Sequence, residues 1–178
     1  LDHIRTSQVA TNDLMRLNQR VGAELDEGDS KLAITLSTRR DTVDFINENK
    51  LKELPGEPTL FRGTIEGDFP ESSLPTPIEL YLKTGAQVIF IKNDIDHQWV
   101  NGTLGTIIGF DDDQDSRIYV RTENGEDVMV EPASWSNMRY HFNETEKKIE
   151  EEEIGRYLQY PIRLAWAITV HKSQGLTF

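Results

Sequence analysis

The sequence contains no cysteine, which excludes disulfide bonds and cysteine-ligated zinc and fits a reducing compartment such as the cytoplasm. No apolar run approaches the roughly 20 residues that a membrane-spanning helix needs. No signal peptide is present, so we expect no membrane partner. The phosphate-cradling motif G-x-x-x-x-G-K-[ST] is absent, and no acidic strand end of the Walker-B kind is evident. The sequence therefore carries no P-loop nucleotide site.

Basic residues are scarce, because 19 Lys and Arg stand against 31 Asp and Glu and give a net charge of −12. Affinity for nucleic acid comes largely from neutralising phosphates with cations, so this charge argues against DNA binding by the chain alone. The acidic residues concentrate in Asp111–Asp115 and Glu144–Glu153, which we interpret as solvated segments away from any binding groove. The 178 residues, 37% of them hydrophobic, are typical of one substantial globular domain or two small ones.

The most informative stretch is the carboxyl end, where ten almost wholly apolar residues, Pro161 to Val170, precede the polar residues His171 to Gln174 and then Gly175. Its β-branched content predicts a strand buried on both faces, as in a parallel sheet. A buried strand that leads into a polar turn at its carboxyl end is a place where open α/β sheets bind ligands. One lysine and several hydroxyl and imidazole donors favour phosphate as that ligand. The alternative is a core strand followed by an ordinary surface turn.

The amino-terminal part predicts half of a βαβ unit. A first helix is expected from its N-cap Asn12 to Gly22. A buried strand over Leu32–Leu36 and a helix from Arg39 to about Leu54 follow. Arg39 and Arg40 then lie at the carboxyl edge of a strand and at a helix start.

The middle of the chain predicts a β-rich unit. Short alternating segments separated by Asp, Asn and Gly turns are typical of a small barrel. Asn124-Gly125 predicts a tight hairpin, and Trp99, Trp135 and Tyr140 either stack on bases or plug the ends of the barrel. Glu144 to Tyr157 is expected to be extended or partly helical. The expected strands are Thr59–Glu66, Glu79–Leu82, Gln87–Ile91, Thr103–Phe110, Ile118–Thr122 and Asp127–Val130.

Three segments resemble superfamily 1B DNA helicases, the 5′-to-3′ branch that contains the Pif and RecD types. The last residues, LAWAITVHKSQGLTF, resemble motif V, and STRRDTVDFIN at 37–47 resembles motif IV. LKTGAQVIFIKND and WVNGTLGTIIGF resemble the SH3-like insertion called 2B. The resemblance implies an α/β fold, a partial RecA-like parallel-sheet domain with an inserted small SH3-like β-barrel. It assigns residues 1–78 and 159–178 to the RecA-like domain 2A and residues 79–158 to 2B.

The resemblance also implies residue roles. Arg39, or Arg40 beside it, would stabilise the phosphoryl group of ATP in catalysis, and Asn47 matches another recurrent polar position of motif IV. A helix-face asparagine that makes only local hydrogen bonds is the alternative for Asn47. Gln174 and Gly175 would couple the nucleotide to DNA, and no metal ligand is expected. The residues implied to hold the backbone of single-stranded DNA are Thr169, His171, Lys172 and Ser173.

The implied protein is an ATP-dependent DNA helicase of repair or recombination that uses ATP and Mg²⁺, translocates on single-stranded DNA and unwinds duplex. The first residue is Leu, and the resemblance stops before motif VI, so we expect a piece of a longer protein. Its partner would be the first RecA-like domain of the same chain, which would hold the P-loop. Alone, the piece is expected to bind no cofactor, to hydrolyse no ATP and to be open to chain-to-chain pairing at an unpaired sheet edge.

Two other functional classes remain open from the residues. One is a non-enzymatic interaction module, in which the barrel binds protein or peptide and the α/β part is a scaffold; the net charge favours it. The other is a nuclease or DNA-end processor, which would need a cluster of carboxylates around a metal.

Overall fold

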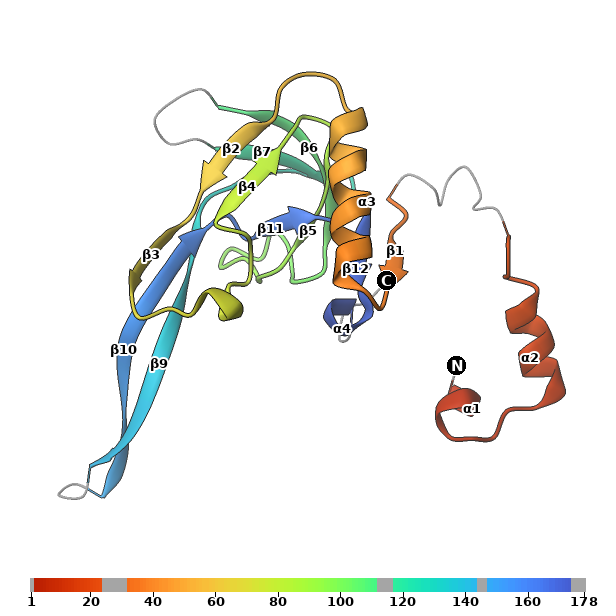
Figure 1. Cartoon of the computed structure of the whole chain (residues 1–178), viewed down its shortest axis with the longest axis horizontal. Helices are drawn as coiled ribbons and strands as arrows, with labels where there is room; N and C mark the ends of the chain where they lie inside the picture. The colour runs from red at the N-terminus through yellow and green to blue at the C-terminus, as the bar shows by residue number, and fades with distance from the viewer. Residues whose placement is uncertain (1, 24–31, 112–116, 144–146, 174–178) are drawn as a thin grey trace. The chain divides into compact units, whose positions relative to one another are not determined.

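The computed structural model describes residues 2–23, 32–111, 117–143 and 147–173, and it divides the chain into two units, Leu1–Ala33 and Ile34–Phe178 (Figure 1). The first unit contains the helices α1 (Asp2–Arg5) and α2 (Thr11–Asn18). The predicted N-cap at Asn12 is wrong. Helix α2 begins after Ala10, because the Asp13 carboxylate accepts a hydrogen bond from the Ala10 N–H at 3.0 Å. It also ends before Gly22, and none of its residues is buried.

The second unit opens with the predicted strand and helix. Strand β1 (Thr35–Ser37) lies a few residues later than expected, and the prediction that it is buried is wrong, since Leu36 is 51% exposed. Helix α3 (Arg40–Glu53) follows the predicted bounds closely. Strand β1 pairs in parallel with β12 (Ala167–Thr169), which leads directly into helix α4 (Val170–Ser173). The predicted parallel pairing of the C-terminal run is therefore confirmed, and α3 lies beside the pair (Figure 1).

The single strand predicted over Pro161–Val170 is instead two strands in two sheets. Strand β11 (Ile162–Leu164) pairs antiparallel with β5 (Gln87–Phe90), and β12 follows after a break at Ala165 and Trp166. The Ala165 N–H donates to the Gln87 carbonyl at 2.9 Å, and the Gln87 side-chain amide donates to the Ala165 carbonyl at 2.9 Å. The apolar run is buried in both sheets, so its composition gave no signal for the change of partner.

Strands β11, β5, β6 (Leu104–Phe110), β7 (Ile118–Thr122) and β8 (Asp127–Val130) form, in that order, an antiparallel sheet. The four predicted strands β5, β6, β7 and β8 are confirmed, and so is the hairpin at Asn124-Gly125, where Gly125 has a φ of +85°. In the described part of the chain β8 and β11 do not pair, and a closed barrel is not detected. The fully buried core residues of this sheet include Phe90, Ile107, Ile118, Val120, Val130 and Ile162.

The strand predicted over Thr59–Glu66 is also divided. Strand β2 (Thr59–Arg62) pairs with β4 (Glu79–Leu82), whereas β3 (Thr64–Gly67) pairs with β10 (Lys148–Gln159). The break falls at Gly63, where a Cβ would lie 2.8 Å from the Tyr157 ring. The short helix η1 (Glu71–Ser73) follows β3.

Strand β10 pairs along its length with β9 (Ala133–Asn143), which was not predicted, and the two form a long hairpin (Figure 1). The Glu144–Tyr157 segment is extended over its described residues and is not helical.

Two of the three singled-out aromatic residues pack internally. Trp99 is buried, stacks on Phe90 with ring centroids 4.5 Å apart and donates through Nε1 to the Lys92 carbonyl, so it belongs to the core. Trp135 stacks on Tyr157 at the base of the β9–β10 hairpin. Tyr140 is 62% exposed and lies on the hairpin itself. None of the helices in the described ranges is long and apolar enough to cross a bilayer.

Candidate functional site

The candidate site lies where β1 and β12 end. Their register pairs Ser37 with Thr169, and Arg39 and His171 each follow two residues after that pair. Because the strands are parallel, both side chains leave the sheet at the same edge. The structure therefore brings together the two segments that the sequence singled out, which are separated by more than a hundred residues.

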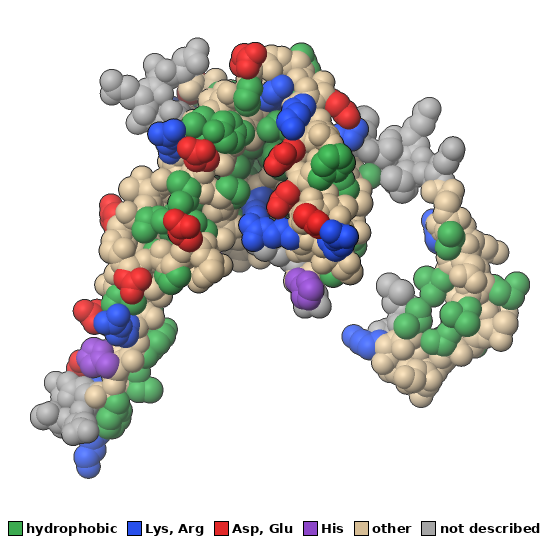
Figure 2. All heavy atoms as spheres, in the orientation of Figure 1, with side chains coloured by type: hydrophobic (Ala, Val, Ile, Leu, Met, Phe, Trp, Pro, Cys, Tyr) green, Lys and Arg blue, Asp and Glu red, His purple; other side chains and the backbone are tan. Residues whose placement is uncertain are grey.

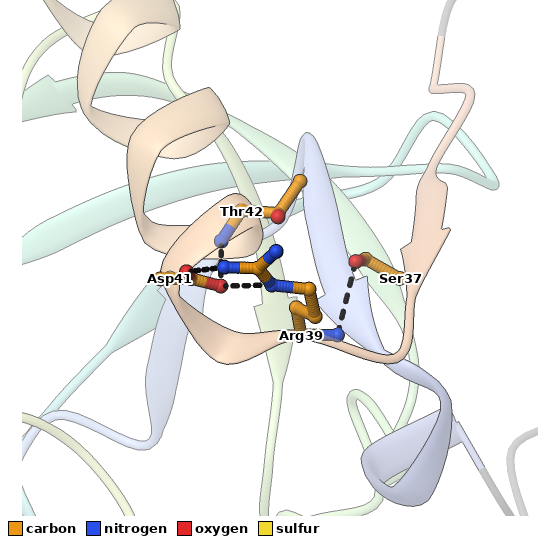
Figure 3. A network of polar contacts seen from close by, with 4 residues as sticks. All are labelled: Ser37, Arg39, Asp41 and Thr42. Atoms are coloured by element: carbon orange, nitrogen blue, oxygen red, sulfur yellow. Dashed lines mark hydrogen bonds and ion pairs between the residues drawn. The ribbon is translucent and has the colours of Figure 1, made fainter.

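The turn between β1 and α3 holds Arg39 in a small polar network (Figure 3). The Arg39 N–H donates to Ser37 Oγ at 3.1 Å, and its guanidinium donates through Nε to Asp41 Oδ1 at 3.1 Å. A second guanidinium nitrogen, Nη2, forms an ion pair with Asp41 Oδ2. The Thr42 N–H also donates to Asp41, at 2.8 Å. The neighbouring guanidinium, followed by the Thr42 N–H, lowers the pKa of Asp41, so its carboxylate stays ionised at neutral pH.

Arg39 is nevertheless accessible, since its side chain is 73% exposed. An ion pair in contact with water is weak and screened by salt, so an incoming anion can replace Asp41 at little cost. Arg40 is also exposed, and its Nε lies 3.7 Å from Asp44 one turn along α3. The two arginines thus have different partners: Arg39 pairs with Asp41 at the start of α3, whereas Arg40 lies near Asp44 and lines a cleft.

The remaining predicted site residues follow β12. Thr169 is half-buried and lines the cleft, and His171 is exposed in α4. Lys172 and Ser173 lie in α4, but their side chains are not described. Gln174 and Gly175 fall outside the described residues.

The cleft has a volume of about 630 Å³ and is lined by one face of α3, by the segment around η1 and by residues of β4, β5, β11 and β12. Figure 2 shows basic and acidic side chains beside each other around a hollow with apolar side chains at its floor. Arg163 enters this cleft opposite Arg40. Burial lowers the pKa of Arg163, and the positive charge of Arg40 lowers it further. Arg163 was not predicted as a site residue, although it is the one cation inside the otherwise apolar run from Pro161 to Val170.

Asn47 is the other residue whose role was not identified. It is 8% exposed, and its side chain bonds the backbone of Ala167 in β12 through both amide atoms. The alternative of purely local hydrogen bonds is therefore wrong. The signal in the sequence was the spacing Val43, Asn47, Leu51, which puts an amide on the buried stripe of a helix.

No group of three or more metal-ligating side chains occurs within the described ranges. The candidate site instead offers hydrogen-bond donors that suit phosphate oxygens. They are the guanidinium groups of Arg39 and Arg40, the hydroxyl of Thr169 and the imidazole of His171.

Comparison with known proteins gives a consistent result. No protein-family model matches the sequence. The chain is 32% identical over 180 residues to the ATP-dependent DNA helicase PIF1 of Xenopus laevis, covering 97% of the chain and 26% of that protein. It is 31% identical over 182 residues to the ATP-dependent DNA helicase Pif1 of Bdellovibrio bacteriovorus, covering 99% of the chain and 38% of that protein.

Solved structures agree with these relatives. Bacteroides sp. Pif1 in complex with ADP-AlF4 superposes with a TM-score of 0.84 at 36% identity, over 99% of this chain and 40% of that one. Bacteroides Pif1 bound to single-stranded DNA superposes with a TM-score of 0.71 at 37% identity, over 99% of this chain and 39% of that one. The expected likeness to Pif-type helicases is thus confirmed as homology, over a region that spans between about a quarter and two fifths of those proteins.

Proposed function

We propose that this chain, a homologue of part of the Pif1 ATP-dependent DNA helicases, is part of the second motor domain of such a helicase. The whole protein would translocate on single-stranded DNA and unwind duplex. The observation that carries the proposal is the pairing of Ser37 with Thr169. It puts the turn between β1 and α3, which we call the arginine turn, and the turn between β12 and α4 at the carboxyl ends of the same two strands. A nucleotide-dependent movement at one turn would therefore act directly on the other.

The arginine turn would act on the phosphates of ATP. A planar, permanently charged guanidinium fork stabilises the charge that develops on a transferring phosphoryl group. Arg39 would exchange the Asp41 carboxylate for phosphate oxygens, and Arg40 would remain beside Asp44 at the cleft. These side chains fit phosphate but offer no carboxylate cluster for Mg²⁺, so we place the metal ligands elsewhere in the full-length protein. ATP, when bound, supplies the free energy for stepping.

The turn after β12 would hold the backbone of single-stranded DNA. Thr169, His171 and Ser173 supply donors to phosphate oxygens, Lys172 supplies a charge, and Gln174 with Gly175 would link this turn to the nucleotide. Backbone contacts carry no sequence information, which suits an enzyme that must move along any strand.

The domain assignment belongs to the same proposal. Residues 1–78 and 159–178 would form the RecA-like domain 2A, and residues 79–158 the SH3-like insertion 2B. The antiparallel order of β5, β6, β7 and β8 supports such an insertion. Strand β11 pairs with β5 in the same sheet, so the return to the parallel pair falls at Ala165 and Trp166, a few residues after the expected boundary at 159. The proposal places the protein in the cytoplasm, with which a chain that has no disulfide bonds to lose is compatible.

The test uses the full-length protein with Arg39→Ala, Arg40→Ala and His171→Ala, and with Arg121→Ala as a matched control. Arg121 is an exposed arginine that pairs with Asp127 on the five-stranded sheet, away from the turns. We expect Arg39→Ala to lower DNA-stimulated ATP hydrolysis by about a thousandfold or more. The control should retain wild-type rates. Full activity in Arg39→Ala together with Arg40→Ala would contradict the proposal.

The 178-residue chain alone should hydrolyse no ATP, because its sequence contains no P-loop. A phosphate-release assay with single-stranded DNA present measures this, and clear turnover that survives repurification would contradict the assignment of the P-loop to another part of the protein.

A further inference from the structure

Strand β12 has two hydrogen-bonding edges, and among the described residues only the edge toward β1 faces another strand. The Thr35 N–H donates to the Trp166 carbonyl at 2.9 Å, and Thr35 is the register partner of Ala167. In a parallel ladder, this pattern turns the backbone groups of residues 166 and 168 toward β1 and those of Ala167 away from it. Ala167 is fully buried, so its N–H and C=O need partners on the far side.

Asn47 of α3 supplies both partners. Its Nδ2 donates to the Ala167 carbonyl at 2.9 Å, and its Oδ1 accepts from the Ala167 N–H at 2.9 Å. A carboxamide presents one donor and one acceptor side by side, as a peptide group does, so this one side chain takes the place of a neighbouring strand. The pairing also fixes the orientation of the amide, because only Oδ1 can face the N–H.

We propose that Asn47 is a positioning residue that fixes α3 to β12 and so couples the arginine turn to the turn after β12. Arg40 lies seven residues before Asn47, roughly 10 Å along the helix, and Thr169 lies two residues after Ala167, roughly 7 Å along the strand. The clamp therefore joins the two elements between their functional ends. A displacement at the start of α3 is carried to Thr169 and His171 instead of being lost as sliding of the helix over the strand. This inference rests on the proposed function.

No other common residue preserves both bonds. Asn47→Asp keeps the acceptor but puts a second oxygen against the Ala167 carbonyl, and Asn47→Ala leaves both backbone groups without a partner. Asn47→Gln moves the amide by one methylene within a buried site. Val43→Ala is the matched control, since Val43 lies one turn earlier on the same face and is 7% exposed, compared with 8% for Asn47.

The experiment measures ATP hydrolysis by the full-length protein with and without single-stranded DNA, the KM for ATP and the thermal midpoint of each variant. We expect Asn47→Ala and Asn47→Asp to lower the stimulation by DNA about tenfold while the KM for ATP is unchanged. Val43→Ala should lose thermal stability but keep the stimulation. A wild-type stimulation ratio in either folded Asn47 variant, or an equal loss in Val43→Ala, would overturn the inference.

A second measurement does not depend on the variants folding. In the wild-type protein, residue-resolved amide exchange at Ala167 should be slow, and ADP with aluminium fluoride should slow it further as the nucleotide binds near Arg39. Exchange at Ala167 that is fast, or that is unchanged by the nucleotide, would overturn the inference. Absence of DNA-stimulated hydrolysis in the wild type would instead contradict the proposed function itself.

Discussion

The five-stranded sheet and the β1–β12 pair are neighbours in the second unit, but they are stabilised in different ways. The sheet surrounds a core of fully buried side chains that includes Phe90, Val120 and Ile162. Each strand of the pair has three residues. The edge of β12 that faces away from β1 is hydrogen-bonded by the side chain of Asn47. The candidate functional residues lie at the ends of the β1–β12 pair and not in the packed core of the sheet.

This contrast predicts that the sheet mainly determines stability and that the strand pair mainly determines activity. A packed core resists deformation, because interior groups are as dense as in organic crystals. A short pair that is held by a few directional hydrogen bonds can shift as one piece with its helix. We therefore expect substitutions in the sheet to change stability, and substitutions at the strand ends to change activity without changing stability.

The largest effect on stability should come from Phe90→Ala. The Phe90 ring is fully buried and stacks on Trp99, so removing it should lower the free energy of unfolding by about 3–5 kcal/mol. Urea denaturation of the chain measures the change. Val100→Ala, an exposed position on the neighbouring loop, should change it by less than about 0.5 kcal/mol. Equal effects would show that the sheet has no specific core.

Gly105→Ala should have the next largest effect. A Cβ there would lie 2.5 Å from Val120 Cγ1 and 2.9 Å from the Arg121 carbonyl, so we expect a loss of about 1–3 kcal/mol in unfolding free energy. Gly109→Ala on the same strand is the control, because nothing lies within 4 Å of its Cβ. If both variants unfold at the same denaturant concentration, the close packing of β6 on β7 is not real.

Tyr157→Phe tests the base of the β9–β10 hairpin. The Tyr157 hydroxyl donates to the carbonyls of Thr76 or Pro77, at 3.1 and 3.0 Å, and losing it should cost about 0.5–1.5 kcal/mol. Tyr81→Phe, whose hydroxyl bonds an exposed carboxylate, should cost less.

Burial also raises the pKa of Tyr157. Stability from its neutral form is therefore fully present below the ordinary tyrosine pKa and is lost as pH rises through the raised value. Alkaline unfolding followed by circular dichroism should show this loss in the wild type, and the loss should be absent in Tyr157→Phe.

The smallest effect on stability belongs to His171→Ala. The side chain is exposed, so the unfolding free energy should change by less than about 0.5 kcal/mol. The affinity of the full-length protein for single-stranded DNA should nevertheless fall, as fluorescence anisotropy would show. His141→Ala, an exposed histidine on the hairpin, should leave that affinity unchanged. A loss of affinity in His141→Ala alone would place the DNA contact on the hairpin.

Local patterns were sufficient to predict much of this fold. Asn124-Gly125 marked its hairpin because glycine readily adopts the positive φ of +85° that this turn has at Gly125, and the β-branched residues around Ile118 and Val128 marked the strands beside it. Motif resemblance singled out Arg39 and His171, and the register of β1 with β12 brings the turns that carry them to the same end of the pair.

Other features depend on contacts between residues that are far apart in sequence, and these were missed. The run after Pro161 changes sheets at Ala165, although both halves are apolar. Residues 137–143 of β9 alternate polar with apolar side chains, a strand signal that was overlooked. Its apolar residues Tyr140 and Phe142 are exposed, and its partner β10 looks like a solvated acidic segment. The role of Asn47 requires knowing that β12 has an open edge.

The excursion between β2 and β4 has a practical consequence for protein engineering. It leaves at Gly63 and returns at Ile78, where the Gly63 N–H donates to the Ile78 carbonyl at 2.8 Å. This hydrogen bond links the first and last residues of the excursion. The pairing of β2 with β4 on its other side therefore does not depend on the residues between them. A module that replaces residues 64–70 would therefore disturb the β3 ladder, the Asp68 hydrogen bonds and the Phe69–Tyr157 ring contact without changing the alignment of β2 with β4. Glu71, Ser72 and Leu74 line the cleft, so a graft should leave them in place.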